Sequence, residues 1–287
     1  MADYQDIYYQ SQDGLRLYAR DYAHGSPKAT ILCMHGLTRN SADFEGIANH
    51  LAPDYRLVVV EQRGRANSEW DPTPENYQPA VYVQDMFTLL DQLQLDSVVL
   101  MGTSLGGLMS MIMSAMQPER IRAVIMNDIG PVVNPAGLER IKGYVGKSGP
   151  VANWDDAIAE QQSINGREFP DFSDAQWLGF VKALYRENAD GVPVLAYDPA
   201  ISKPMLEDQD SAVPPDLWPA FDALKPLPTL VIRGELSDIL ARDCVSEMRS
   251  RKPDLVFAEI PNRGHAPILD EPGSIAAIDQ FLGEVLA

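Results

Sequence analysis

The chain has 287 residues, of which 45% are hydrophobic, so it is long enough to bury one sizeable core and to carry an inserted subdomain. Its formal net charge of −18 at pH 7 would repel the phosphates of nucleic acid and the anionic lipids of a membrane surface. Partners of both kinds are therefore disfavoured. We expect a small-molecule substrate, and the oligomeric state stays open.

The two cysteines and the N-terminus bear on the cellular compartment. Nothing in the spacing of Cys33 and Cys244 suggests a disulfide framework or a zinc site. The first six residues contain no basic region followed by an apolar stretch, and no run approaches the length that spans a bilayer. We therefore expect an unexported, cytoplasmic protein in a reducing environment.

Short runs rich in Val, Ile and Leu alternate with helix-like segments along the chain. Residues 7–10 and 15–18 predict an antiparallel hairpin at the sheet edge, because the intervening Asp13-Gly14 tolerates the positive φ of a tight turn. This rhythm predicts an α/β fold, with a mostly parallel, eight-stranded sheet and helices on both faces. The other strands are expected at 30–34, 57–60, 97–101, 123–126, 229–232 and 255–258, and helices near 41–51, 79–94, 105–116 and 273–285.

Residues 102–106 read Gly-Thr-Ser-Leu-Gly, directly after an apolar strand and directly before a helical pattern. This is the context that a Gly-x-Ser-x-Gly nucleophile turn requires, since small residues leave room for a sharp strand-to-helix bend that exposes the serine. A helix N-terminus at this point also directs free N–H groups at any oxyanion formed nearby. The pattern indicates that Ser104 is a nucleophile.

A serine hydroxyl needs a general base, and histidine is the usual one. The chain contains four: His24 in a polar turn, His50 near the end of a predicted surface helix, His35 at the start of a loop, and His265 just beyond the last predicted strand. Elimination and position favour His265 as the base and give His35 a structural role.

The base needs a carboxylate to fix its tautomer. Asp238 follows the strand at 229–232 after a short loop, while Asp128 follows the strand at 123–126. Both satisfy the chain order of nucleophile, acid and base. We favour Asp238 and interpret Asp128 as a turn or capping residue.

Two backbone N–H groups are the economical way to bind the oxyanion of a tetrahedral intermediate. Leu105, the residue after the nucleophile, supplies one. Leu37 is expected to supply the other, because Gly36 lets its loop approach closely. The expected reaction is formation of an acyl-enzyme on Ser104 and its hydrolysis by water, with no metal or organic cofactor.

The chain resembles the α/β-hydrolase superfamily over nearly its whole length, within the branch of capped serine hydrolases that includes enol-lactonases, esterases and carbon–carbon bond hydrolases. Matching features are the loop at 35–36, the pair Arg63-Gly64, the turn at 102–107 and the segments 234–238 and 264–265. The usual Asp-x-Arg-Gly-x-Gly pattern is replaced by residues 61–66, Glu-Gln-Arg-Gly-Arg-Ala. A serine at position 104 argues against dehalogenase and epoxide hydrolase activity, which use an aspartate there.

The resemblance implies an α/β-hydrolase core at 1–130 and 223–287, with a helical cap at 131–222. Fifteen acidic and seven basic residues in this cap segment favour a neutral, largely apolar ester or lactone. An anionic substrate would need a basic clamp such as Arg63, Arg65 or Arg140. Ten aromatic residues of the cap could form an apolar pocket or the cap's own core: Tyr144, Trp154, Phe169, Phe172, Trp177, Phe180, Tyr185, Tyr197, Trp218 and Phe221.

Other functions fit the same residues. A carbon–carbon bond hydrolase of ring-cleavage diketones and an acyltransferase would use the same triad. A non-catalytic ligand-binding protein of this fold is an alternative from a different class.

Overall fold

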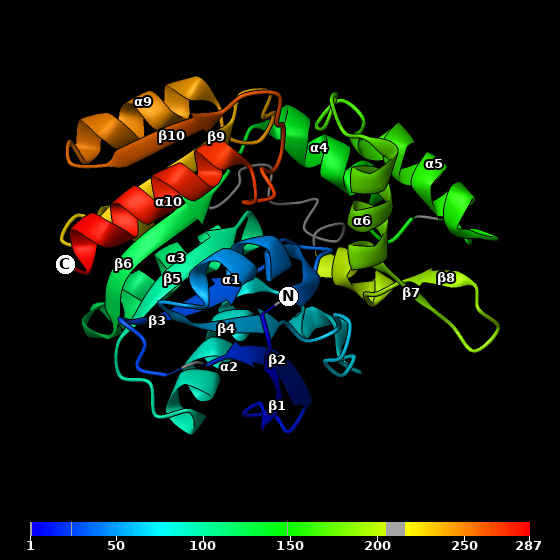
Figure 1. Ribbon diagram of the computed structural model, residues 1–287, viewed down its shortest axis with the longest axis horizontal. Helices are drawn as coiled ribbons and strands as arrows, with labels where there is room; N and C mark the ends of the chain where they lie inside the picture. The colour runs from blue at the N-terminus through cyan, green and yellow to red at the C-terminus, as the bar shows by residue number, and fades with distance from the viewer. Residues whose placement is uncertain (1, 24, 148, 205–215) are drawn as a thin grey trace.

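A computed structural model describes residues 2–23, 25–147, 149–204 and 216–287 (Figure 1). Its centre is an eight-stranded sheet in the order β1-β2-β4-β3-β5-β6-β9-β10. Within this sheet, β2 runs in the opposite direction to the other seven strands. The predicted sheet, including its N-terminal hairpin, is confirmed. The strands are β1 (Gln5–Gln10), β2 (Arg16–Tyr22), β3 (Thr30–Met34), β4 (Arg56–Glu61), β5 (Val98–Thr103), β6 (Ile121–Asn127), β9 (Thr229–Gly234) and β10 (Val256–Ile260).

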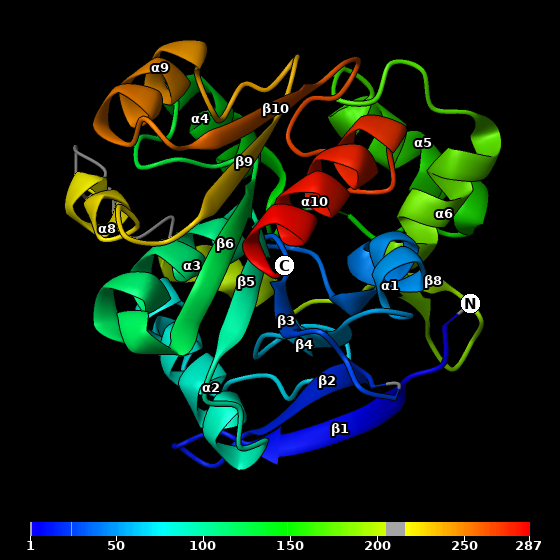
Figure 2. The ribbon, with the colours of Figure 1, turned by 60° about the vertical axis from the view of Figure 1, so that its left-hand side comes forward.

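Helices cover both faces of the sheet, because alternate residues of each buried strand point to opposite sides. In β3, Ile31 and Cys33 pack in the core under α1 and α10, whereas Leu32 and Met34 pack in the core under α2 and α3. Figure 2 shows these two pairs of helices on opposite sides of the sheet. The helices of this layer are η1 (Ser41–Phe44), α1 (Glu45–Leu51), η2 (Pro74–Asn76), α2 (Pro79–Gln92), α3 (Leu105–Met116), η3 (Pro118–Arg120), α9 (Arg242–Arg251) and α10 (Pro272–Val285).

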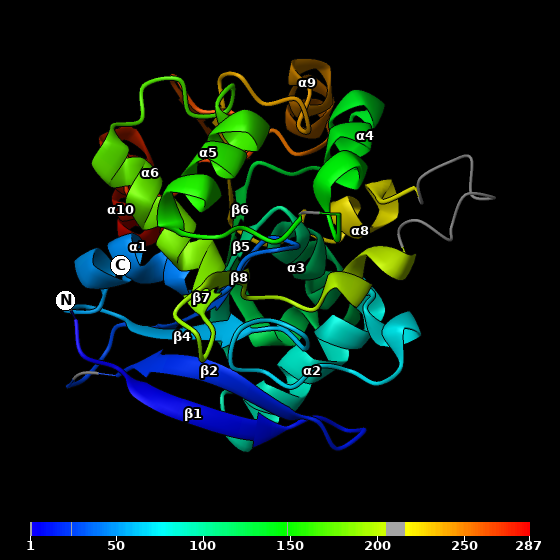
Figure 3. The same ribbon diagram turned by 90° about the vertical axis from the view of Figure 1, so that its right-hand side faces the viewer.

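The segment between β6 and β9 is the one that the sequence predicts as a cap. Figure 3 shows α5 and α6 of this segment side by side, with α4 standing apart from them. Among its aromatic side chains, Phe169 stacks on Phe172 with 4.4 Å between ring centroids, and Trp177 and Phe180 pack edge-on or tilted against them. The described elements are α4 (Pro135–Tyr144), α5 (Trp154–Asn165), α6 (Asp174–Leu184), β7 (Tyr185–Glu187), β8 (Pro193–Leu195), η4 (Pro199–Ser202) and α8 (Trp218–Asp222).

Within the described ranges, no helix has both the length and the apolar character needed to cross a membrane.

A buried arginine anchors the loop that follows β4. Arg63 is 1% exposed and forms ion pairs of 2.7 Å with Asp13, 2.6 Å with Asp71 and 2.7 Å with Asp85. Asp13 belongs to the N-terminal hairpin and Asp85 to α2, so the guanidinium ties three separate segments to one point. Removing one partner from such a buried cluster leaves uncompensated charge.

This cluster predicts a pH-dependent contribution to stability. The hydrogen bond from Arg63 lowers the pKa of Asp13 from 3.8 to about 2. Because the folded-state pKa is the lower one, the stabilisation is complete above the unfolded value and is lost as the pH falls towards 2. We expect Asp13→Asn to lower the unfolding free energy by about 1 kcal/mol or less near neutral pH, since solvent screens this half-exposed carboxylate.

Urea unfolding at near-neutral pH and at about pH 2 checks this prediction. The control is Asp54→Asn, which removes an exposed ion pair with Lys28. A loss of stability that is equal at both pH values would contradict the assignment.

Candidate active site

Ser104 lies at the turn between β5 and α3, with a φ of 52°. This left-handed conformation is uncommon for a residue with a side chain and stores strain that the surroundings must hold. They do so by close packing, since a Cβ on Gly102 would overlap the backbone of Gly106, and a Cβ on Gly106 would overlap the carbonyl of Met34. The two glycines are therefore required at this turn, as the motif predicts.

His265, in the loop after β10, reaches Ser104 from the other side. Its Nε2 lies 2.8 Å from the Ser104 Oγ. The backbone N–H of His265 donates to the Glu168 carboxylate at 2.7 Å, and the N–H of Gly264 donates to the Glu168 carbonyl at 2.8 Å. The segment between α5 and α6 thus holds the histidine loop through two hydrogen bonds. The structure therefore brings Ser104 and His265, the nucleophile and base that the sequence predicts, into contact.

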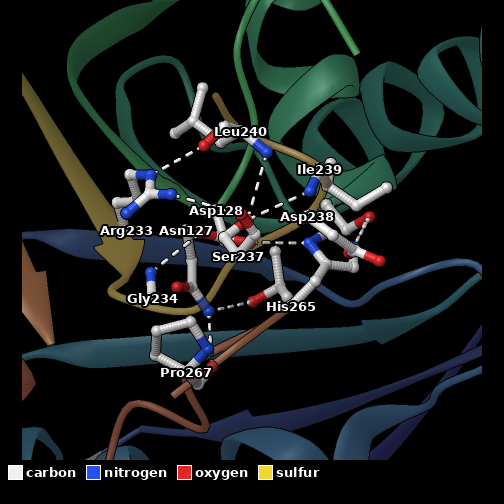
Figure 4. A network of polar contacts seen from close by, with 12 residues as sticks. Asn127, Asp128, Arg233, Gly234, Ser237, Asp238, Ile239, Leu240, His265 and Pro267 are labelled. Carbon is white, nitrogen blue, oxygen red and sulfur yellow. Dashed lines mark hydrogen bonds and ion pairs between the residues drawn. The ribbon is translucent and has the colours of Figure 1, made fainter. Parts of the chain in front are cut away.

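The carboxylate bonded to His265 in the structure is Asp128 and not Asp238, the acid that the sequence analysis favoured (Figure 4). Asp128 is fully buried at the end of β6, and its Oδ2 lies 2.8 Å from the His265 Nδ1. It also accepts hydrogen bonds from the Gly234 N–H at 2.8 Å and from the Ser237 hydroxyl at 2.6 Å. A carboxylate with these partners is fixed in position and fixes the Nδ1–H tautomer of the ring.

Asp238 binds a cation instead of the His265 ring, and no local sequence pattern indicates this pairing. Arg140 of α4 binds the Asp238 carboxylate through two hydrogen bonds of 2.6 and 2.8 Å and also lies 3.8 Å from Glu168. This two-pronged geometry is the strong form of an arginine–carboxylate pair. Arg140 lowers the pKa of Asp238 against the opposing effect of burial. One signal could have favoured Asp128: it ends a strand adjacent to the one that carries Ser104.

Leu37 and Leu105 flank Ser104 as expected. Leu105 is the first residue of α3, and the loop before Leu37 passes so close that a Cβ on Gly36 would lie 3.8 Å from the Ser104 Cβ. Neither Leu37 N–H nor Leu105 N–H has a hydrogen-bond partner in the described part of the chain. Two free donors beside a serine hydroxyl are the arrangement that stabilises an oxyanion.

His35 orients the peptide that carries the Leu37 N–H. Its Nδ1–H donates to the Gly36 carbonyl at 2.7 Å, and its Nε2 accepts the Gln62 N–H at 3.2 Å. The same carbonyl accepts the Arg39 N–H at 3.2 Å. Because C=O and N–H point in opposite directions in a trans peptide, fixing the Gly36 carbonyl also fixes the Leu37 N–H.

Burial, with a smaller contribution from the positive charge of Arg65, lowers the pKa of His35 to about 3. The ring is therefore neutral at physiological pH, which this pattern of one donor and one acceptor requires. Of the other histidines, His50 pairs with Asp279 at the surface, and His24 lies outside the described residues. The structural role expected for His35 agrees with its contacts.

A cavity of about 310 Å³ opens above Ser104 and His265. None of Arg63, Arg65 and Arg140, the clamps expected for an anionic substrate, is among its lining residues. Arg39 does line it, but pairs with Asp43 at 2.6 Å. Half of the ten aromatic residues expected in the cap line this cavity: Tyr144, Phe169, Phe172, Phe180 and Tyr197.

Within the described ranges, no group of three or more His, Cys, Asp or Glu side chains is arranged to hold a metal ion.

Known proteins of similar sequence and structure place this geometry within a family. A family model described as the alpha/beta hydrolase fold matches residues 29–272. The chain is 34% identical to the 3-hydroxybutyrate-oligomer hydrolase of Cupriavidus necator, over 93% of this chain and 92% of that protein. It is 26% identical to the 2-(acetamidomethylene)succinate hydrolase of Mesorhizobium japonicum, over 82% and 81%. The crystal structure of an alpha/beta hydrolase from Novosphingobium aromaticivorans is 44% identical and superposes over 99% of both chains with a TM-score of 0.93.

The contact between Asp128 and His265 predicts a proton resonance. A proton held between the Nδ1 of a histidine and a buried carboxylate is strongly deshielded, so we expect one far-downfield signal that His265→Ala removes. Asp128→Asn should abolish or shift this signal, whereas Asp238→Asn, the matched control, should leave it in place. One-dimensional proton NMR of the three variants is the measurement. The opposite ranking would return the acid to Asp238.

Proposed function

Because the chain belongs to the α/β-hydrolase family, we propose that it is a serine hydrolase that cleaves a small carboxylic ester through an acyl-enzyme on Ser104. The observation that carries this proposal is the continuous chain of two 2.8 Å contacts from Ser104 through His265 to buried Asp128, at the floor of a cavity. This connection supplies a nucleophile, a base and a group that orients the base.

In the proposed acylation step, the Ser104 Oγ attacks the ester carbonyl carbon while its proton passes to the His265 Nε2. Asp128 stabilises the imidazolium that forms. The carbonyl oxygen becomes an oxyanion, which the N–H groups of Leu37 and Leu105 bind. Collapse of this intermediate breaks the bond to the alcohol oxygen, and the alcohol leaves with the proton from His265.

Hydrolysis of the acyl-enzyme repeats these steps with water as the nucleophile. Water gives a proton to His265 and attacks the acyl carbon, and the same two N–H groups bind the second oxyanion. The bond to the Ser104 Oγ then breaks, and the serine recovers its proton from His265. The product is the free carboxylic acid.

The cavity supports an ester of modest size. Its volume lies at the lower end of the range for small-molecule sites. We propose that residues 131–222 act as a cap, because the aromatic wall formed by Phe169, Phe172 and Phe180 comes from this segment. The Cupriavidus necator relative acts, by its name, on oligomers of 3-hydroxybutyrate, whose units are joined by ester bonds. Short hydroxyacid oligomers are therefore the first substrates to test.

A fluorophosphonate probe tests the nucleophile. Such probes form a covalent adduct with an activated serine hydroxyl, so we expect stoichiometric labelling of Ser104 in the native protein and none in Ser104→Ala. Peptide mass spectrometry locates the adduct. A folded native protein that takes up no probe would contradict the hydrolase proposal and favour a non-catalytic ligand-binding role.

Turnover tests the acid. With p-nitrophenyl butyrate and the 3-hydroxybutyrate dimer as substrates, we expect Asp128→Asn to lower kcat about 10³-fold or more, because the imidazole loses its orienting carboxylate. Asp238→Asn should cost less than about tenfold, since its carboxylate bonds to Arg140 and not to the base.

Adding a ring-cleavage diketone and an acceptor alcohol to this assay separates the rival activities. Cleavage of a ring-cleavage diketone without cleavage of either ester would replace the esterase proposal by carbon–carbon bond hydrolysis. Transfer of the acyl group to an added alcohol in preference to water would indicate an acyltransferase.

A further inference from the structure

Arg65 is a buried cation with no acidic partner among the residues that the structure describes. It lies in the loop after β4 and is 0% exposed. Arg63, two residues earlier, faces three carboxylates, whereas Arg65 forms no ion pair with any described residue. Burying a charge without a counter-ion is unfavourable, so neutral groups must compensate for its lost hydration.

The compensating groups belong to the loop beside Ser104. The Nε and Nη2 of Arg65 donate to the Leu37 carbonyl at 3.0 and 2.8 Å. Its Nη1 donates to the Arg63 carbonyl at 2.7 Å and to the Tyr82 hydroxyl at 2.9 Å, and the guanidinium lies 4.9 Å from the centroid of the Tyr82 ring. The planar fork of an arginine holds its acceptors in a fixed direction, which the ammonium of a lysine does not.

These contacts complete the restraint on Leu37. The peptide before it is held through the Gly36 carbonyl by His35 and by the Arg39 N–H. The peptide after it is held through the Leu37 carbonyl by Arg65. Both peptide planes that meet at Leu37 are thus fixed, and its N–H stays directed and free.

We propose that Arg65 is a positioning residue for the oxyanion site: it locks the Leu37 loop and places an unpaired positive charge behind it. This inference rests on the proposed function, because the oxyanion forms only if Ser104 attacks a carbonyl. Donors that are fixed before the reaction need no reorganisation when charge develops, and a nearby cation in a water-poor interior acts over several ångströms. The lowered pKa of His35 agrees with a field from Arg65 that reaches this loop.

The backbone of the same loop also contacts the predicted cap. The Ala66 N–H donates to the Ala196 carbonyl at 2.7 Å, and the Asp198 N–H donates to the Gly64 carbonyl at 2.8 Å. Tyr197, which pairs with Arg65 in an isolated β-bridge, lines the cavity. The loop that carries Arg65 is therefore held by the predicted cap on one side, while the Arg65 side chain holds the Leu37 carbonyl on the other.

The test compares Arg65→Met and Arg65→Lys with Arg120→Met. Arg120 is a matched control, since it also donates to a backbone carbonyl, that of Leu95, at 2.8 Å, but lies before β6, at the opposite end of the strands from Ser104. The measurements are kcat and KM for p-nitrophenyl butyrate, and the affinity of a trifluoromethyl ketone, which forms a tetrahedral oxyanion adduct with an active serine.

For Arg65→Met we expect kcat and the ketone affinity to fall together by about 30- to 100-fold, with KM changed less than about threefold. Arg65→Lys keeps the charge but not the fork, so its losses should be intermediate, about tenfold in both quantities. Arg120→Met should keep both quantities within about threefold of the native values, whatever it costs in thermal stability.

Three results would overturn the proposal: a folded Arg65→Met with native kcat, a loss confined to KM, or a loss of kcat that the ketone affinity does not follow. If Arg65→Met does not fold, the same criteria apply to Arg65→Lys. Failure of the proposed function has a different signature, since the native protein would then leave both the fluorophosphonate and the ester unreacted.

Discussion

The main chain at Ser104 adopts a φ of 52°, and two close contacts hold it there: Gly102 packs against the backbone of Gly106, and Gly106 packs against Met34 at the end of β3. This bend determines where the hydroxyl points and where α3 begins. It therefore also sets the position of the Leu105 N–H. The other parts of the site come from neighbouring loops at the same sheet edge, because the carboxyl ends of parallel strands converge there. A distortion of this turn would separate the hydroxyl from His265 even if every other residue kept its place.

Asp128 connects three of these loops. It directly follows β6, which lies between β5 and β9 in the sheet. Its carboxylate contacts His265, the N–H of Gly234 at the end of β9, and the Ser237 hydroxyl in the loop after β9. Its own φ of 55° is one that aspartate tolerates better than most residues. In the proposed mechanism, the segment after β9 does not supply the acid. It supplies two hydrogen bonds that hold the carboxylate of the acid in place.

The sequence predicted what depends on local pattern. Each buried strand is a short apolar run between turn residues, and the contact between Ser104 and His265 follows from a motif and from the few histidines available. The choice between Asp128 and Asp238 depended on Arg140, which lies 98 positions from Asp238 in the chain and pairs with it only after folding. Long-range ion pairs of this kind leave no local signal. The partners of Arg65 were hidden for the same reason.

The two arginines of the loop after β4 show how a strongly acidic chain distributes its charges around a reaction. Arg63 is surrounded by carboxylates and serves the fold, while Arg65 has only neutral partners in the described part of the chain. In the proposed mechanism, positive charge develops on His265 and negative charge on the substrate oxygen. Asp128 stands beside the first, and the charge of Arg65 stands behind the loop that binds the second. A carboxylate beside Arg65 would neutralise its charge and weaken the stabilisation of the substrate oxygen. Among the described residues Arg65 has no such partner, and this favours a role in the reaction over a role in stability.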